Sequence, residues 1–155
     1  MTSSFDQRLS NLAIELPNLP KPIANYVASH QVGNILYVSG QLCLSADGKL
    51  VATGLLGETV SVDDGVSAAR AAAINVLAQA RTAVGSLDKI KRVVRLGGFV
   101  AAAPAFSDHA RVMNGASDLM VEVFAEHGYH TRSTIGVTSL PLQAAVEVEA
   151  MFELH

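Results

Sequence analysis

The sequence is poor in the residues that form disulfides, metal clusters and nucleic-acid surfaces. It has one cysteine, Cys43, no tryptophan, and only 11 basic side chains against 14 acidic ones. One cysteine excludes an intrachain disulfide and a multi-thiolate metal site. A net charge of −3 without a basic run argues against a nucleic-acid partner, because phosphate binding depends on clustered lysine and arginine.

Long apolar runs are also lacking. The most apolar stretch, residues 93–105, is interrupted by Arg95 and Pro104 and is shorter than the roughly 20 residues that a bilayer requires. The first 20 residues lack the basic start and apolar run of a signal peptide. Yet 50% of the residues are hydrophobic and the mean hydropathy is +0.32. We therefore expect one cytoplasmic domain over residues 1–155, with no membrane partner, that hides part of its surface in a subunit interface.

The hydrophobic periodicity predicts an α+β fold, with one mixed or antiparallel sheet and two long helices on one face. The predicted elements are a short helix at 3–14 capped by Ser3 or Ser4, strands at 26–32 and 35–44 joined by Gly33-Asn34, a helix from Asp63 to a cap at Gly85, a strand at 90–101 with a bulge at Gly97-Gly98, a helix from Ser107 or Asp108 to Gly128, and strands at 131–139 and 144–154.

The last two predicted strands bring charged side chains together. Alternation places Arg132 and Thr134 on one face of the first strand and Glu147 on one face of the second. A turn near residues 141 and 142 would pair the strands and set Gly136 opposite Glu147. Arg132, Thr134 and Glu147 would then share one surface. An arginine fork suits a small carboxylate, which it holds by two parallel hydrogen bonds; the alternative is a solvated strand face with weak ion pairs.

These segments resemble those of a known family. The motifs are GYHTRSTIG at 128–136, SLP at 139–141, AVEVEA at 145–150, PIANYV at 22–27 and LYVSGQ at 36–41. Together they are similar to the Rid family, also called YjgF or endoribonuclease L-PSP, over about residues 16–154. The longer chorismate-mutase-like subgroup fits best, with residues 1–16 as its N-terminal helical extension. The resemblance implies a homotrimer around a central barrel, with sites between subunits.

The resemblance also implies hydrolytic deamination of small 2-imino acids, of the 2-iminopropanoate and 2-iminobutanoate type, to 2-keto acids and ammonia. This chemistry requires no metal or organic cofactor. Arg132 would clamp the substrate carboxylate and Glu147 would orient the attacking water. Thr134 joins them as a catalytic residue, although archetypal deaminases have cysteine there. The implied substrate-binding residues are Tyr26, Ser39, Gly40 and Asn114.

Other functions stay open. A non-catalytic trimer could bind a keto acid or an amino acid through Arg132 and act in regulation. An endoribonuclease fits the acidic balance poorly, and chorismate-mutase-like chemistry rests on fold analogy alone. Cys43 lies in an apolar strand and is expected to be a buried side chain rather than a nucleophile. His127 and His130 have the spacing of a metal pair but lack a third ligand, so no metal site is expected.

Overall fold

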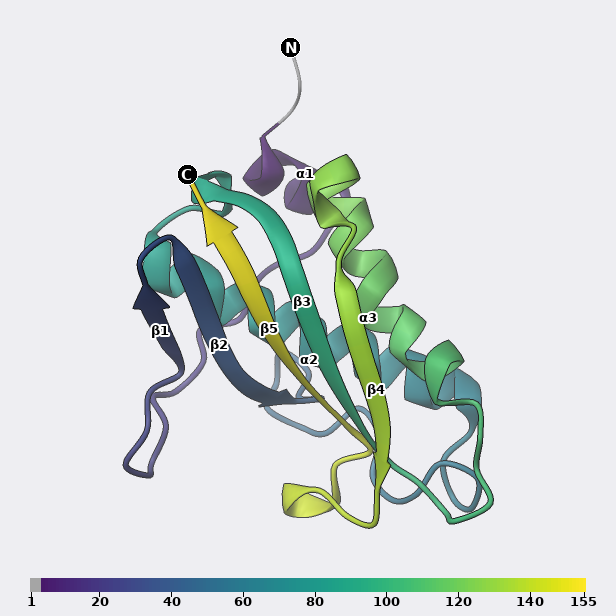
Figure 1. Ribbon diagram of the computed structural model, residues 1–155. Helices are drawn as coiled ribbons and strands as arrows, with labels where there is room; N and C mark the ends of the chain where they lie inside the picture. The colour runs from purple at the N-terminus through teal and green to yellow at the C-terminus, as the bar shows by residue number, and fades with distance from the viewer. Residues whose placement is uncertain (1–3) are drawn as a thin grey trace.

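The computed structural model describes residues 4–155 and shows a five-stranded sheet with two long helices across one face (Figure 1). The strands lie in the order β1-β2-β5-β3-β4. β3 and β4 run parallel, and the other neighbouring pairs are antiparallel. The predicted α+β class with a mixed sheet is therefore confirmed. The elements are α1 Phe5–Asn11, β1 Ser29–Val32, β2 Ile35–Leu42, α2 Val62–Val84, η1 Leu87–Lys89, β3 Ile90–Ala101, α3 His109–Phe124, η2 Ala125–Gly128, β4 Thr131–Val137, η3 Pro141–Gln143 and β5 Val146–Leu154.

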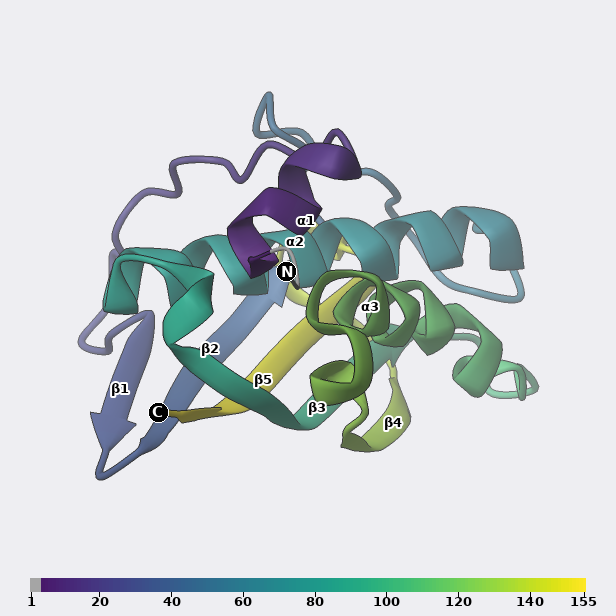
Figure 2. The ribbon, with the colours of Figure 1, turned by 90° about the horizontal axis from the view of Figure 1, so that it is seen from above.

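The sheet has one covered face and one open face. α2 and α3 lie against the covered face, and α1 rests on the outer side of the helical layer (Figure 2). Phe5 of α1 packs edge-on against Phe124 of α3, with ring centroids 4.9 Å apart. Ser4 caps α1 as predicted, whereas Ser3 lies outside the described residues. In the described part of the chain, no helix covers the open face, and none is long and apolar enough to cross a membrane.

The long helix α2 begins and ends close to its predicted positions. The Ser61 hydroxyl accepts a hydrogen bond from the backbone N–H of Asp64 at 3.1 Å, and Gly85 ends the helix with a left-handed φ of 89°. Its buried side is mostly alanine, so neighbouring elements approach closely. Gly115 of α3 lies directly against the backbone carbonyl of Val66, where a side chain would not fit. The two helices therefore form one thin layer.

The hydrophobic core lies between this layer and the covered face. β5 sends alternate side chains into the core, and Glu147 and Glu149 face the open side, as predicted. Cys43 is fully buried, and its thiol lies 3.6 Å from the carbonyl oxygen of Ala52. The interpretation of Cys43 as a buried small side chain is confirmed. The buried members of β5 are Val146, Val148, Ala150, Phe152 and Leu154.

The sheet has a bulge in β2 and two register shifts near the start of β3, between Ile90 and Arg92 and between Val93 and Arg95, but none at the predicted glycine pair. The register with β5 shifts between Val38 and Gln41, so residues 39 and 40 together oppose one residue of β5. β3 keeps its register through Gly97 and Gly98, so the bulge predicted there is wrong. Those two glycines serve close packing instead. A Cβ would lie 2.7 Å from Glu149 Cγ at Gly97 and 2.5 Å from the sulfur of Met113 at Gly98.

The last two strands do not form the predicted hairpin. β3 lies between them, and Phe99 pairs with Glu147 on one side and with Ile135 on the other. The prediction that Gly136 faces Glu147 is therefore wrong. The physical reason is the crossover through α3, which returns the chain so that β4 runs parallel to β3 along its outer edge. β5 then fills the position between β2 and β3.

Candidate functional site

Arg132 lies on β4, the edge strand of the sheet, and faces the helical layer. It pairs with the buried Leu96 of β3, and Thr134 pairs with Gly98, so both side chains lie on the covered side. α3 runs above this strand and supplies polar groups to it. Because β4 is an edge, the outer side of this region stays open to a ligand or to another chain.

Three uncharged acceptors from α3 hold the Arg132 guanidinium. Nη1 donates to Asn114 Oδ1 at 2.9 Å and to Ser117 Oγ at 3.0 Å, and Nη2 donates to the Ala110 carbonyl at 3.2 Å. A guanidinium has five N–H donors, and these bonds use three of them. The two free donors are Nε–H and one Nη2–H, whose nitrogen atoms lie on the same edge of the guanidinium. That edge can hold a carboxylate by two parallel hydrogen bonds. Since no acidic side chain of residues 4–155 pairs with Arg132, the surface ion-pair interpretation is wrong for this residue.

Thr134 and a histidine continue the same side of β4. The Thr134 hydroxyl oxygen is buried and has no hydrogen-bond partner among the described residues. Such a group is uncommon in folded proteins, and a bound ligand or water can satisfy it. His109, in the first turn of α3, covers Gly136, where a Cβ would lie 2.5 Å from Nε2. Sequence pattern did not indicate His109, because only the crossover brings it to this strand.

Glu147 lies on β5 with its carboxylate on the open face. Its side chain crosses Gly40 of β2, where any Cβ would collide with the carboxylate. Burial, and then the nearby charge of Glu149, raises the pKa of Glu147 above the usual range of a glutamic acid. No cation within residues 4–155 forms an ion pair with it. A carboxyl group with a raised pKa holds a proton more readily than an exposed glutamic acid, which suits it to proton transfer.

The bulge of β2 places Ser39 beside Gly40. The Ser39 hydroxyl donates to the Val27 carbonyl at 2.7 Å, and its backbone N–H donates to the Ala28 carbonyl at 2.9 Å. These bonds tie the segment before β1 to the bulge. Tyr26, in that segment, is 57% exposed. The structure thus brings Ser39, Gly40 and Glu147 together, whereas Tyr26 lines a separate hollow with Gln79 and Thr82 of α2.

The predicted site residues fall into two groups on opposite faces of the sheet. The arginine site consists of Arg132, Thr134, Asn114 and Ser117, and the glutamate site consists of Glu147, Ser39 and Gly40. One strand separates β4 from β5, so their backbones lie roughly 10 Å apart in the plane of the sheet. The prediction that Arg132, Thr134 and Glu147 share one surface is therefore wrong within a protomer.

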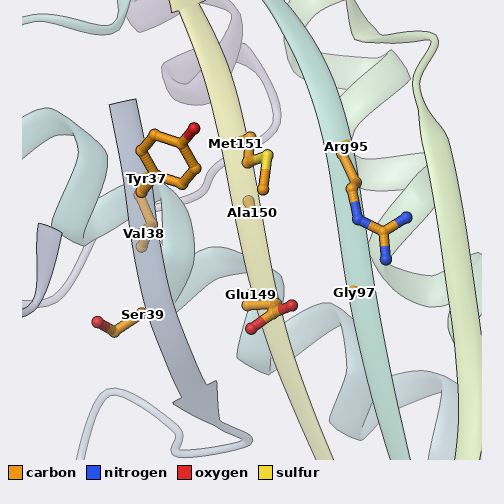
Figure 3. Close-up of a pocket in the computed structure, with 8 residues that line it drawn as sticks. All are labelled: Tyr37, Val38, Ser39, Arg95, Gly97, Glu149, Ala150 and Met151. Atoms are coloured by element: carbon orange, nitrogen blue, oxygen red, sulfur yellow. The ribbon is translucent and has the colours of Figure 1, made fainter. Parts of the chain in front are cut away.

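A shallow cavity of about 210 Å³ opens on the open face next to the glutamate site (Figure 3). The Glu149 carboxylate lies over Gly97, and Arg95 Nη1 donates to the Ser133 hydroxyl at 3.4 Å. Sequence reasoning missed Arg95, although its spacing of two from Gly97 places both on one face of β3. The lining residues are Tyr37, Val38, Ser39, Arg95, Gly97, Glu149, Ala150 and Met151.

A family model covers nearly the whole chain. The model described as "YjgF/chorismate mutase-like, putative endoribonuclease" matches residues 6–154. This chain belongs to that family. The resemblance carried by the motifs around Arg132 and Glu147 is thereby confirmed.

Relatives of this YjgF-family protein include one that is named as a deaminase. "Protein TCP17" of Trypanosoma cruzi is 46% identical over 148 residues, which cover 95% of this chain and 92% of the relative. The 2-iminobutanoate/2-iminopropanoate deaminase of Dermatophagoides farinae is 31% identical over 138 residues, 89% of this chain and 92% of the relative. A crystal structure of a "putative endoribonuclease" from Shewanella oneidensis MR-1 gives a TM-score of 0.94 at 34% identity, covering 98% of this chain and 100% of the other.

The two neighbouring histidines of the YjgF-family chain face different partners. His127 pairs with Glu126 at 3.7 Å, whereas His130 contacts the Ser117 hydroxyl at 3.0 Å. Across residues 4–155, no three histidine, cysteine or acidic side chains gather as metal ligands would. The two rings thus lie against different groups, Glu126 for His127 and Ser117 for His130.

Proposed function

We propose that this protein hydrolyses small 2-imino acids to 2-oxo acids and ammonia. The observation that carries the proposal is Arg132, whose guanidinium is held by uncharged acceptors and keeps two N–H donors for a ligand. A 2-imino acid has its carboxylate next to the C=N carbon, so holding the carboxylate fixes the position of the reacting atom. The deaminase relative from Dermatophagoides farinae supports this substrate class.

A second copy of the chain completes each site in this proposal. Glu147 cannot reach a carboxylate held by Arg132 of the same protomer, because the two side chains lie on opposite faces of the sheet. In a closed ring of three copies, the arginine site of one protomer can meet the glutamate site of the next. The open faces then line a central barrel. Tyr37 and Ile135, which are 42% and 51% exposed on the open face, support such an association.

In the proposed reaction, water adds to the imine carbon. Glu147 accepts a proton from the water as its oxygen bonds to carbon, and passes that proton to the imine nitrogen. The product is a carbinolamine, with a hydroxyl and an amino group on one carbon. The hydroxyl proton then moves through Glu147 to the amino group, the C–N bond breaks, and the 2-oxo acid and ammonia leave. The raised pKa of Glu147 suits both transfers.

The test generates 2-aminoacrylate from serine with a dehydrating enzyme and follows pyruvate release, with the residual imine trapped by semicarbazide. The wild-type protein is expected to accelerate pyruvate release. Arg132→Ala should lose about 100- to 1000-fold in kcat/KM, because a charge-assisted fork is removed. Arg111→Ala is the control, since Arg111 forms an exposed ion pair with Asp63 on the same helix layer. No acceleration by micromolar wild-type protein would contradict the proposal.

A carboxylate-binding protein without turnover is the second candidate. One protomer contains the whole arginine site, and this observation favours the second candidate. Binding a carboxylate needs only Arg132 and the three acceptors of α3 that hold its guanidinium. Catalysis needs Glu147 in addition. Wild-type protein that binds 2-oxobutanoate in calorimetry but releases no pyruvate from 2-aminoacrylate would establish this second function.

A further inference from the structure

His130 and Ser117 form a chain of hydrogen bonds that ends on Arg132. His130 Nδ1 lies 2.6 Å from the Gly128 carbonyl oxygen, and His130 Nε2 lies 3.0 Å from Ser117 Oγ. Ser117 Oγ in turn accepts from Arg132 Nη1 at 3.0 Å. The sequence pattern offered His130 only as half of a metal pair, and the proposed reaction does not use it.

The direction of each bond in this chain follows from its partners. A carbonyl oxygen only accepts, so His130 Nδ1 must carry the proton and Nε2 of the neutral ring must be an acceptor. The Ser117 hydroxyl therefore donates to His130, which turns its lone pairs toward Arg132. Burial lowers the pKa of His130; the hydrogen bond to the Gly128 carbonyl opposes this shift, and the positive charge of Arg132 adds to it, so the net shift favours the neutral ring.

Both ends of the chain are anchored to α3. Ser117 belongs to this helix, and Gly128 lies against its backbone, where a Cβ would come within 2.7 Å of Val121 Cα. The carbonyl that orients His130 is thus fixed by glycine packing. The same helix supplies Asn114, the second acceptor of Arg132 Nη1. One rigid element consequently sets the orientation of the guanidinium through two routes.

We infer that Ser117 and His130 are positioning residues that orient the Arg132 guanidinium, so that its two remaining N–H groups face the substrate carboxylate. The role of the carboxylate rests on the proposed function; the orientation of the guanidinium does not. Neither residue touches the reacting atoms. Their loss should weaken carboxylate binding and raise KM, while kcat at saturating substrate changes little.

The first test measures binding of 2-oxobutanoate by calorimetry, together with KM and kcat in the imine assay. Ser117→Ala and His130→Phe are each expected to raise Kd and KM about tenfold and to change kcat less than about threefold, as expected for one lost hydrogen bond to a charged group. Ser117→Thr keeps the hydroxyl and should restore binding. Ser67→Ala, on the exposed side of α2, is the matched control.

The second test needs no ligand. Nitrogen-15 NMR of the wild-type protein at pH 7 is expected to show His130 as the neutral Nδ1–H tautomer and the Arg132 Nη groups in slow rotation. Ser117→Ala should mix the tautomers and speed that rotation. Unchanged tautomer and rotation in Ser117→Ala would overturn the inference, as would a fall in kcat alone. If the Arg132 Nη groups rotate slowly in the wild-type protein but the protein binds no 2-oxo acid, the positioning role of Ser117 and His130 would be supported and the proposed function overturned.

Discussion

The arginine site and the glutamate site differ in how the fold holds their charged groups. Arg132 is fixed by three hydrogen bonds to one helix, so its orientation is set before any ligand arrives. Glu147 is half-buried, lies over a glycine and pairs with no cation of residues 4–155. One protomer therefore carries an arginine whose orientation is already fixed and a partly desolvated carboxylate on the opposite face of the sheet.

The largest expected effect separates proton transfer from binding. Glu147→Gln keeps the shape of the side chain and removes its basic oxygen, so kcat for imine hydrolysis should fall about 10²- to 10⁴-fold. The Kd for 2-oxobutanoate should stay within about threefold, because Arg132 is intact. Steady-state kinetics and calorimetry on one preparation check both. An equal loss in binding and in kcat would contradict the assignment of proton transfer to Glu147 and of carboxylate binding to Arg132.

Mixed oligomers test whether the two sites belong to different protomers. Arg132→Ala and Glu147→Gln protomers, each inactive alone, are co-expressed with different tags and purified as hybrids. In a closed ring of three copies that contains both variants, about one third of the sites would combine an intact arginine site with a neighbour's intact glutamate site. Activity near that fraction of wild type is expected. Hybrids as inactive as their parents would show that Arg132 and Glu147 do not meet across an interface.

Two glycine substitutions compare the open face of the sheet, at Gly40, with the covered face, at Gly98. Gly40→Ala would displace only the flexible carboxylate of Glu147, so kcat should fall about tenfold with little change in Tm. Gly98→Ala would press on Met113, which is fully buried in the helical layer, and overpacking of this kind costs about 1–3 kcal/mol. Its Tm should fall by about 3–10 °C. Thermal scans and kinetics of both variants distinguish these outcomes; a Gly40→Ala protein that melts early with normal kcat would contradict the assignment.

The smallest expected effect concerns stability against pH. The pKa of Glu147 is raised in the folded protein, so the folded state binds more protons than the unfolded state between the two pKa values. The free energy of unfolding therefore falls as pH rises through the folded pKa. Glu147→Gln removes this penalty and should raise Tm by about 1 °C at pH 7 but not at pH 4, measured at equal protein concentration. The same Tm difference at both pH values would exclude burial of the charge as its cause.

Local patterns predicted most elements of the fold. The strand at Ile90–Ala101, the cap at Gly85 and the hairpin around Gly33-Asn34 follow from propensity and alternation, which act over a few residues. The partner of β4 could not be predicted in this way. Pairing depends on the path of the α3 crossover, and alternation reads the same whether a strand pairs with the next strand or with an earlier one.

The bulge in β2 left no signal in the sequence, because apolar residues occupy even positions on both sides of it, at Leu36, Val38, Leu42 and Leu44. Only the structure shows the buried face moving from Val38 to the odd position Cys43. Strict alternation cannot make that change without an extra residue. The roles of Ser117 and His130 left no sequence signal either, because their contacts join α3 to the segment before β4 only after the helix has docked.

That extra residue has a consequence for how such a protein can diversify. Residues 39 and 40 share one partner in β5, while the core-facing residues on either side keep their packing. Gly40 is constrained by Glu147, but Ser39 contributes only its hydroxyl bond to Val27 and one wall of the cavity. Substitutions at Ser39 can therefore reshape one wall of this cavity at the cost of one side-chain hydrogen bond, about 0.5–1.5 kcal/mol. Descendants of one scaffold can vary the shape of the cavity here without first finding compensating changes in the core.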